Sequence, residues 1–435
     1  MRLSAAPCVS SDFTIRTPGQ VVTFLHGFEC WEDPLSDVFI IDACRTPIGR
    51  LGGQLALVRP DDLAAHVVGK LVERTDLDPA TIEDVHWGAA NQAGEDNRNV
   101  ARMAVLLAEL PIEVTGATHN RLCGSGLQAV VSAGHALAAG WGDVMVAGGS
   151  ESMSRAPHVI LKAERGFPVG PLKSADSVLG WRFENTTMER LYPPISLGMT
   201  AEVVAEQYGV SRHDQDAFAL ESHRRAVAAI DAEAFADEIE PIAAPTDARR
   251  RQVQTIDSDE GPRRDTSLEA LGRLGAVFKS GGTVTAGNSS PMNDGAAGVV
   301  LASGAWVESH TAAPLARIVQ SAVAGVHPDV MGIGPVPAVN KVLERADLSI
   351  DDIGLVELNE AFAAQSVACI RELGLDPEIV NVNGGAIALG HPLGASGARI
   401  LTTLAHELHR RDARYGLATM CIGVGQGIAM IIERT

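Results

Sequence analysis

The sequence lacks the marks of several large protein classes. Lysine and arginine number 35 against 54 aspartates and glutamates, so the formal net charge is −19. Nucleic acids and anionic membrane surfaces attract basic faces, and this charge balance therefore argues against both as partners. No run of about 18 apolar residues occurs, which argues against a transmembrane helix. A small anionic ligand is compatible with these numbers, because it needs only a local basic pocket.

Cysteine is scarce and scattered along the chain. None of the six cysteines forms a Cys-x-x-Cys pair, so a metal site is not expected. They are also too few and too dispersed for a disulfide framework, and we therefore expect a reducing, cytoplasmic location. The six are Cys8, Cys30, Cys44, Cys123, Cys369 and Cys421.

The residues that are present indicate an α/β protein. Hydrophobic residues make up 46% of the 435 residues and charged residues 20%, which is typical of a soluble globular chain of two or three domains. Short apolar runs at 38–42 and 143–147 predict buried strands, the second of them ended by Gly148 and Gly149. Pro60 opens a helix with acidic residues in its first turn. Strands and helices that alternate at these lengths indicate covered sheets in an α/β architecture.

Two stretches of the chain look like copies of one unit. The run 77–85, followed by Asn91, is similar to the run 348–356, followed by Asn359. In each half a small-residue string ending in Ser-Gly then opens a helix, and a short strand with a glycine turn follows. The common order suggests two halves built by duplication, although chance similarity between two α/β units is the alternative. The strings are 124–126 and 395–397, and the strands are 143–147 and 416–420.

The region between the halves is different. It is richer in charge, and Ser211 and Asp214 form a capping-box-like start to a long Ala-rich helix. We interpret it as an inserted, partly helical domain that could supply the binding surface for a cofactor. The amino-terminal residues show no signal-peptide pattern and are interpreted as an extension, or else as a short segment docked on the core. The expected division is an extension at 1–36, an N-terminal half at 37–152 plus 291–311, a loop domain at 153–290 and a C-terminal half at 312–435.

Two strings place a nucleophile and a base at helix starts. Cys123 stands directly before a Gly-Ser-Gly turn, where the free N–H groups of a helix start lower the pKa of a thiol. His391 lies in a glycine-dense loop, and histidine is the usual base for a cysteine nucleophile. Taken alone, Cys123 could be a structural cysteine in a turn. His391 alone could be a structural histidine, and its loop could bind phosphate.

Two further strings follow predicted strands. Cys421 begins a glycine-rich turn that includes Gly423, and the backbone N–H groups of this turn could form an oxyanion hole. Asn359 stands between a strand and a helix. A β-turn between terminal strands would explain the first string, and a simple helix N-cap the second.

Together these strings resemble the thiolase family, and the resemblance covers residues 37–435. It implies a duplicated, five-layered α/β/α/β/α fold with a loop domain over the active site. Because thiolases are commonly dimers or tetramers, a homodimer or homotetramer is expected. The most specific strings are Asn-Glu-Ala-Phe at 359–362, Gly-Thr-Val-Thr-Ala-Gly-Asn-Ser-Ser at 282–290, Gly-His-Pro-Leu-Gly-Ala-Ser-Gly at 390–397 and Cys-Ile-Gly-Val-Gly-Gln-Gly at 421–427.

The resemblance also implies a reaction and a role for each residue. A 3-oxoacyl-CoA would be cleaved by CoA to acetyl-CoA and a shortened acyl-CoA, or the reverse condensation would run, in two ping-pong steps. Cys123 would accept the acyl group, Cys421 would move a proton to or from the acetyl fragment, and His391 would activate the nucleophile. Asn359 would position a water in one oxyanion site, and the N–H groups of Cys123 and Gly423 would form the other.

Coenzyme A and acyl-CoA are the ligands that the resemblance implies, with no permanently bound cofactor. Arg263 matches a family arginine near the adenine and phosphates, although a solvated surface charge is the alternative. Ser290 matches a serine near the pantetheine chain.

The acyl chain is less well defined. The strings at 90–102 and 180–183 resemble the 3-oxoadipyl-CoA thiolases of aromatic catabolism. The segment 191–202, which lines the acyl pocket in the family, differs from them. It also differs from acetoacetyl-CoA thiolases, which usually place His-Met where Ser196 and Leu197 stand. The sequence therefore leaves 3-oxoadipyl-CoA, acetoacetyl-CoA and medium-chain or ring-derived 3-oxoacyl-CoA as candidate substrates.

Two other functions are compatible with the same fold. A ketosynthase-like condensing enzyme lacks a second cysteine in a Cys-x-Gly turn, so Cys421 argues against it. A non-catalytic lipid carrier on a thiolase scaffold tends to lose catalytic residues. Here Cys123, Asn359, His391 and Cys421 are all present, which favours the enzyme.

Overall fold

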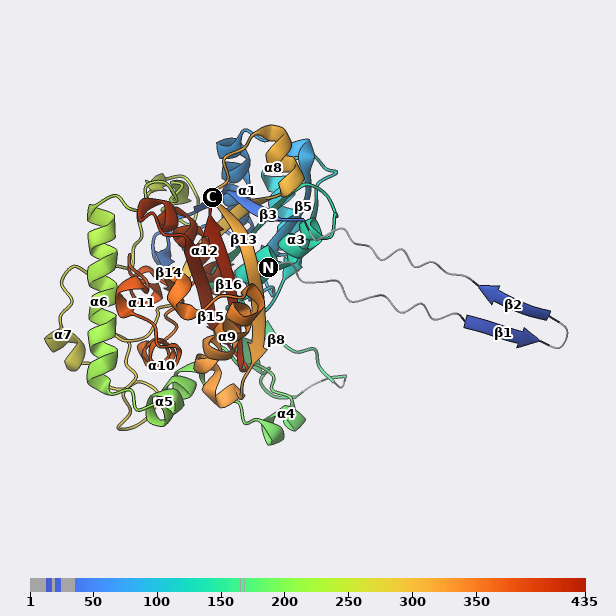
Figure 1. The fold of residues 1–435 in the computed structure, drawn as a ribbon. Helices are drawn as coiled ribbons and strands as arrows, with labels where there is room; N and C mark the ends of the chain where they lie inside the picture. The colour runs from blue at the N-terminus through green and yellow to red at the C-terminus, as the bar shows by residue number, and fades with distance from the viewer. Residues whose placement is uncertain (1–12, 18–19, 25–35, 165, 168) are drawn as a thin grey trace.

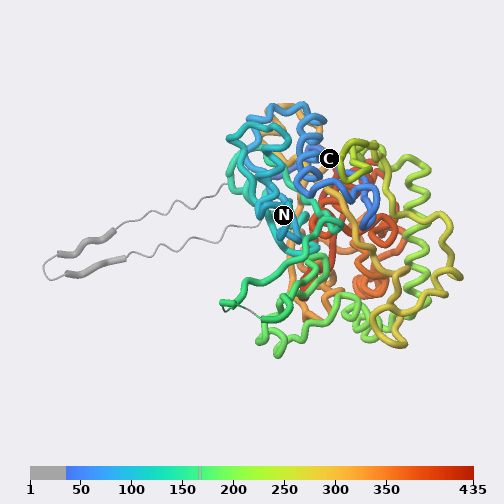
Figure 2. The backbone as a smooth tube through the Cα atoms, turned by 180° about the vertical axis from the view of Figure 1, so that it is seen from behind, coloured from blue at the N-terminus to red at the C-terminus, as the bar shows by residue number. Residues whose placement is uncertain are grey.

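The computed structural model describes residues 13–17, 20–24, 36–164, 166–167 and 169–435. Most of the expected extension at 1–36 lies outside the described residues. Within it, β1 (Phe13–Thr17) and β2 (Gln20–Phe24) pair antiparallel with each other. The rest of the described chain is an α/β body in which the N-terminal half lies beside the C-terminal half (Figures 1 and 2).

Two sheets of the same topology form the core of this body. In each sheet, the strands at one edge run parallel and the two strands at the other edge run antiparallel. The strand that comes last in the sequence of that half lies second from the antiparallel edge. The C-terminal sheet ends in a parallel bridge between Val356 and Val380, at the place that β6 takes in the N-terminal sheet. The N-terminal order is β3 (Val38–Arg45), β12 (Asn293–Ser303), β7 (Val144–Ser152), β5 (Ile82–Gly88) and β6 (Thr115–His119). The C-terminal order is β13 (Ala316–Gly325), β16 (Gln426–Arg434), β15 (Tyr415–Ile422) and β14 (Ile353–Leu358).

This common topology confirms the duplicated α/β architecture expected from the sequence. A short 3-10 turn precedes the matching strand in both halves: η1 (Pro79–Thr81) before β5 and η4 (Ile350–Asp352) before β14. These are the two runs that resemble each other in the sequence. The sheets join through β3 and β13, which pair only at Ala316 with Ile40 and at Arg317 with Phe39.

Helices form the other three layers. Two helices lie between the sheets and pack on both, α3 (Ser125–Ala138) and α12 (Leu393–Arg410). The outer face of the N-terminal sheet is covered by α1 (Pro60–Thr75) and α2 (Val100–Leu107). The outer face of the C-terminal sheet is covered by α9 (Pro335–Ala346) and α10 (Ala363–Leu373). Apolar residues on both faces of each sheet are therefore buried, which explains the continuous apolar runs of the strands.

A long segment between β7 and β12 corresponds to the expected insertion. Its longest helix, α6 (Arg212–Asp231), begins at Ser211 with the predicted capping box to Asp214 and packs against α10 and α11 (Ala386–Leu389). In Figure 1, α6 lies at the edge of the body on the side of the C-terminal half. Its other elements are η2 (Met153–Arg155), β8 (His158–Ile160), β9 (Ser174–Asp176), α4 (Thr186–Leu191), α5 (Leu197–Gln207), β10 (Ile242–Pro245), β11 (Val253–Ile256) and α7 (Leu268–Gly272). The limits of the four domains remain predictions.

One predicted strand end is wrong. β7 does not stop at Gly148 and Gly149 but continues to Ser152. A Cβ atom at Gly149 would lie 2.0 Å from the carbonyl oxygen of Gly394, at the start of α12. The glycines therefore do not end the strand; they let a helix start approach it closely.

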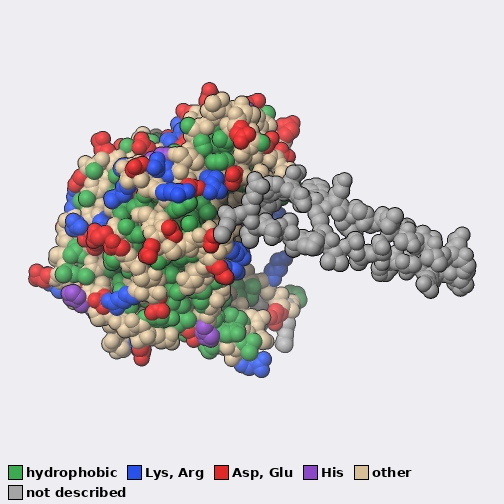
Figure 3. Space-filling model, viewed as in Figure 1, with side chains coloured by type: hydrophobic (Ala, Val, Ile, Leu, Met, Phe, Trp, Pro, Cys, Tyr) green, Lys and Arg blue, Asp and Glu red, His purple; other side chains and the backbone are tan. Residues whose placement is uncertain are grey.

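The remaining short elements connect these layers. They are β4 (Gly49–Arg50), α8 (Gly304–His310), η3 (Pro328–Ile333) and η5 (Pro377–Ile379). Among the helices of the described residues, none has the length and apolar character needed to cross a membrane. On the face shown in Figure 3, acidic and basic side chains are interspersed over the described surface.

Candidate active site

Cys123 lies one residue before the N-cap of α3 and is 8% exposed. Leu122 precedes it with a φ of +47°, a left-handed conformation that turns the chain sharply from β6 into the helix. Burial raises the pKa of the Cys123 thiol to about 11, although hydrogen bonds from the N–H groups of Gly423 and of Cys123 itself pull it down. The expected lowering of this pKa is therefore wrong for the free site, because the loss of water outweighs the helix start. A base is needed to remove the proton.

Cys421 is the second-last residue of β15 and is buried beside Met331, Ala361 and Phe362. Burial raises the pKa of the Cys421 thiol well above its usual range, and the nearness of Cys123 raises it further. Cys123, which is far from Cys421 in the sequence, therefore lies close enough to affect the charge of the Cys421 thiol.

His391 lies between α11 and α12 and is 5% exposed. Its backbone N–H donates to Oδ1 of Asn293 at 2.9 Å, and its Nδ1 lies 2.7 Å from Oγ of Ser396. Nε2 is buried and has no partner among the described residues. Burial, followed by the nearby charge of Arg399, lowers the pKa of His391 to about 4, so the ring is neutral near pH 7.

Asn359 follows β14, and its N–H donates to the carbonyl oxygen of Thr419 on β15 at 3.0 Å. Both polar atoms of its side chain are buried without a partner in the described chain. Ser290 lies against the same loop, since its N–H and Oγ both donate to the carbonyl oxygen of Ala361 at 3.0 Å. Asn359 is therefore not a simple N-cap, and its free amide can receive a ligand or water.

Close backbone packing brings these segments together. A Cβ atom at Gly126 on α3 would lie 2.7 Å from the carbonyl oxygen of Gly394 on α12. A Cβ atom at Gly124 would lie 2.6 Å from the Ile422 side chain, at the end of β15. The first turn of α3 therefore packs closely against the start of α12 and the end of β15, and Asn359 is bonded to β15 through Thr419.

Arg263 lies apart from this cluster. It is exposed on the inserted segment between β11 and α7, and its backbone N–H donates to Nδ1 of His223 on α6 at 3.2 Å. Among the predicted site residues, the structure therefore gathers the two cysteines, Gly423, His391, Asn359 and Ser290, and it leaves Arg263 at the surface.

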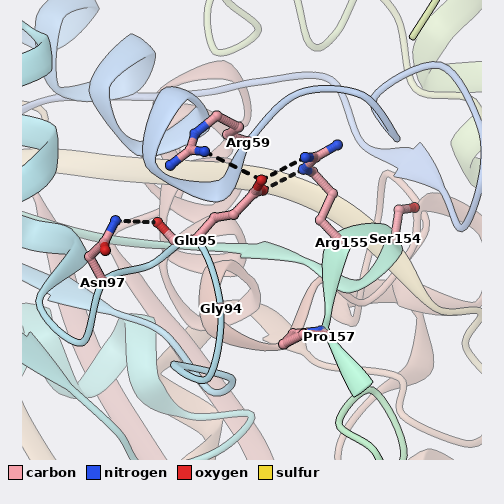
Figure 4. Close-up of a pocket in the computed structure, with 7 residues that line it drawn as sticks. All are labelled: Arg59, Gly94, Glu95, Asn97, Ser154, Arg155 and Pro157. Carbon is pink, nitrogen blue, oxygen red and sulfur yellow. Dashed lines mark hydrogen bonds and ion pairs between the residues drawn. The ribbon is translucent and has the colours of Figure 1, made fainter. Parts of the chain in front are cut away.

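An open surface pocket of about 570 Å³ contains none of the predicted site residues (Figure 4). Glu95 lies at its centre and forms ion pairs with Arg59 at 3.3 Å and with Arg155. Because each charge there already has a partner within the pocket, we interpret it as a structural ion-pair cluster.

Three residues near the site, namely Ser396, Glu151 and Leu122, were not singled out from the sequence. Ser396 contacts His391, and Glu151 accepts the N–H of Gly394 at 2.9 Å. Leu122 lies over Gly423, 3.2 Å from where a Cβ atom would stand, and Leu197 lies 3.8 Å from the same point. Ser396 lies inside the specific string after His391, but only the folded helix turn brings its hydroxyl to the ring. Leu197 falls in the segment expected to line the acyl pocket.

Comparisons with known proteins agree with this arrangement. The model of the thiolase N-terminal domain matches residues 38–305, and that of the C-terminal domain matches 312–434. The chain is 55% identical over 401 residues to a beta-ketoadipyl-CoA thiolase of Pseudomonas aeruginosa, covering 92% of this chain and 99% of that protein. It is 54% identical over 403 residues to a 3-oxoadipyl-CoA/3-oxo-5,6-dehydrosuberyl-CoA thiolase of Escherichia coli K12, covering 92% of this chain and 100% of that one.

A solved structure gives the same result. The chain superposes on human mitochondrial 3-ketoacyl-CoA thiolase in complex with CoA with a TM-score of 0.86 and 42% identity, covering 92% of this chain and 99% of that one. The matched domains span both halves of the described body, including all the strings that suggested the resemblance. This chain belongs to the thiolase family.

Proposed function

We propose that this thiolase-family acyltransferase cleaves 3-oxoadipyl-CoA with CoA, or runs the reverse condensation, through an acyl group on Cys123. One observation carries the catalytic assignment. The Cys421 thiol, whose pKa the nearby Cys123 raises, shares one contact region with an imidazole nitrogen and an amide that have no partner among the described residues. Buried polar atoms are rarely left without partners unless a ligand or water completes them.

In the first step, the thiol proton of Cys123 moves to Nε2 of His391 and the thiolate attacks the 3-keto carbon. The bond between the second and third carbons then breaks. Cys421 gives its proton to the acetyl-CoA carbanion, which leaves acyl-Cys123, a Cys421 thiolate and protonated His391. Since the pKa of Cys123 is about 11, removal of its proton must accompany the attack.

In the second step, the Cys421 thiolate takes the proton of a CoA thiol. The CoA sulfur then attacks the thioester carbon, and the acyl-CoA leaves. The proton held by His391 returns to the Cys123 sulfur, so both thiols are restored and the protons balance.

Negative charge develops on a carbonyl oxygen in both steps. The N–H groups of Cys123 and Gly423 are proposed to hold one such oxygen, and the contact of the Gly423 N–H with the Cys123 sulfur supports this. His391 and a water held by Asn359 are proposed to hold the other. Loss of one such donor typically costs about 2.7–4 kcal/mol of transition-state stabilisation.

Coenzyme A is the proposed second substrate, with Ser290 beside the pantetheine chain and Arg263 beside the adenine and phosphates. The Ser290 hydroxyl donates to Ala361, two residues after Asn359, and the Arg263 side chain is exposed. The human structure that contains CoA has the same fold. A homodimer or homotetramer remains the expected assembly.

The acyl chain is proposed from the two bacterial relatives, whose names specify beta-ketoadipyl-CoA or 3-oxoadipyl-CoA. The test compares kcat/KM for 3-oxoadipyl-CoA, acetoacetyl-CoA and the uncharged 3-oxohexanoyl-CoA. We expect 3-oxoadipyl-CoA to be preferred by at least about tenfold, equal to roughly 1.4 kcal/mol. A preference for either uncharged chain would overturn the substrate while leaving the thiolase chemistry intact.

The separate roles proposed for the two thiols, acyl acceptor and proton donor, can be tested by substitution. Cys123→Ser should lose nearly all acyl transfer. Cys421→Ser should still be acylated at Cys123 by a reactive thioester but should lose carbon–carbon bond chemistry, because no proton donor reaches the carbanion. Intact-mass measurement of the acyl-enzyme and a thiolysis assay separate the two reactions. Equal loss of both in Cys421→Ser would contradict the assignment, and Cys369→Ser, at another buried thiol, is the control.

A further inference from the structure

We propose that Ser396 is a positioning residue that holds His391 in the neutral tautomer whose Nε2 can accept a proton. The inference rests on the proposed function, in which His391 takes the proton of Cys123. Ser396 lies in the first turn of α12 and is 1% exposed. Its Oγ lies 2.7 Å from Nδ1 of His391 and 2.9 Å from the carbonyl oxygen of Pro392.

A serine hydroxyl has one hydrogen, and this restricts how both contacts can form. The carbonyl oxygen of Pro392 can only accept, so the hydroxyl donates to it at 2.9 Å. Oγ must then accept the hydrogen of its other neighbour, Nδ1 of His391, at 2.7 Å. The arrangement therefore places the ring hydrogen on Nδ1.

The opposite arrangement is less favourable. If the hydroxyl donated to Nδ1, the lone pairs of Oγ would face those of the Pro392 oxygen at 2.9 Å with no hydrogen between them. Both groups are buried, so water could not relieve this repulsion. That oxygen already accepts the N–H groups of Ala395 and Ser396 at 2.9 Å, which fixes its position.

The consequence lies at the other ring nitrogen. With the hydrogen on Nδ1, Nε2 carries a free lone pair, and it is buried without another partner among the described residues. A neutral serine adds no negative charge, unlike the carboxylate that holds the histidine of many nucleophile–base pairs. The nearby positive charge of Arg399 opposes a second proton on this ring. His391 is thus kept neutral and correctly oriented until Cys123 releases its proton during attack.

The test compares Ser396→Ala with Ser396→Thr. Alanine removes the acceptor and frees the ring to take the other form, whereas threonine keeps the hydroxyl. We expect Ser396→Ala to lower the rate of Cys123 alkylation by iodoacetamide and the kcat of thiolysis by about 10- to 100-fold. KM for CoA should change little. Ser396→Thr should recover most of the alkylation rate.

A matched control separates this role from packing. Ser366 on α10 is 0% exposed, and its Oγ donates to the carbonyl oxygen of Phe362, four residues earlier, at 3.2 Å and lies 3.5 Å from Oε1 of Gln365. Within the described part of the chain this hydroxyl bonds to no histidine. Ser366→Ala should cost similar stability but leave the alkylation rate within about twofold of wild type. Wild-type alkylation in Ser396→Ala would overturn the proposal, and so would equal losses in Ser366→Ala and Ser396→Ala.

A measurement on the wild-type protein covers the case in which Ser396→Ala does not fold. Nitrogen-15 NMR of histidine-labelled protein, with His391 assigned by comparison with His391→Asn, reports which ring nitrogen carries the hydrogen. Hydrogen on Nδ1 supports the proposal and hydrogen on Nε2 overturns it. Because this readout needs no turnover, it stands even if the proposed substrate or the role of Cys421 fails.

Discussion

At the scale of single residues, the turn after β15 shows how strained the site is. Val424 has a φ of +65°, a left-handed conformation that a β-branched side chain rarely adopts, and it is 41% exposed. It follows Gly423, whose N–H contacts the Cys123 sulfur. Such strain is typical of functional sites, where the surrounding structure holds the backbone in place.

This conformation leads to a prediction on stability. Val424→Gly should raise the free energy of unfolding by up to about 1 kcal/mol, because relief of left-handed strain of about 1–2 kcal/mol exceeds the entropic cost of glycine. Urea unfolding measures the change. Gly425→Ala is the counterpart: its φ is +83° and its Cβ would lie 2.3 Å from the Val326 oxygen, so it should destabilise. A loss of stability in Val424→Gly as large as in Gly425→Ala would show that the valine is unstrained.

At the scale of elements, the site depends on how closely α3 and α12 approach. Gly126 of α3 faces the backbone of Gly394 and Ala398, where a Cβ atom would lie at 2.7 and 2.9 Å. A Cβ atom at Gly134, on the same helix, would meet only the Ile318 side chain among the described residues, at 3.6 Å. Gly126 therefore permits the close contact between α3, which follows Cys123, and α12, which follows His391. Gly134 has no such role.

Alanine substitution at these positions should have opposite effects. Gly126→Ala should cost about 1–3 kcal/mol of stability, because rigid backbone must move, and it should also lower acyl transfer. Gly134→Ala should gain about 0.5–1 kcal/mol, the usual preference for alanine over glycine inside a helix. Unfolding and thiolysis measured on both variants check this. Full activity in Gly126→Ala would mean that the interhelix contact does not position the site.

At the scale of the whole molecule, buried charges attach the inserted segment to the core. Arg45 on β3 is 0% exposed and forms ion pairs with Glu238 at 2.6 Å and Asp259 at 2.8 Å. Both carboxylates belong to the segment between β7 and β12, so the core strand and the insertion share one charge network. Thr403 of α12 donates to Glu238 at 3.1 Å and extends this network to the central helix layer.

Removal of the central charge should therefore loosen the whole molecule. Arg45→Met should cost about 3–5 kcal/mol, because two buried carboxylates lose their counter-charge. Thermal unfolding and proteolysis within the insertion measure the loss. Arg273→Ala breaks an exposed pair with Glu269 and should cost at most about 1 kcal/mol. Equal effects of the two substitutions would show that burial adds nothing to the network.

Much of the architecture was accessible from the sequence because it depends on local chemistry. The Ser211 capping box and the helix start at Pro60 appear where predicted. The two similar runs lead into β5 and β14, the corresponding strands of the two halves. Turn residues, caps and apolar periodicity act over a few neighbours, so their order along the chain is enough. The same holds for the strings that assign the family.

Other properties were decided only by the tertiary structure. The passage of β7 through Gly149 depends on Gly394, and the high pKa of Cys123 depends on burial beneath segments hundreds of residues away. The hydroxyl of Ser396 reaches His391 only when α12 forms its first turn. Electrostatic and packing interactions depend on distance in space and not on separation along the chain. The sequence therefore identified the reacting groups, whereas the fold determined their protonation states and their contact partners.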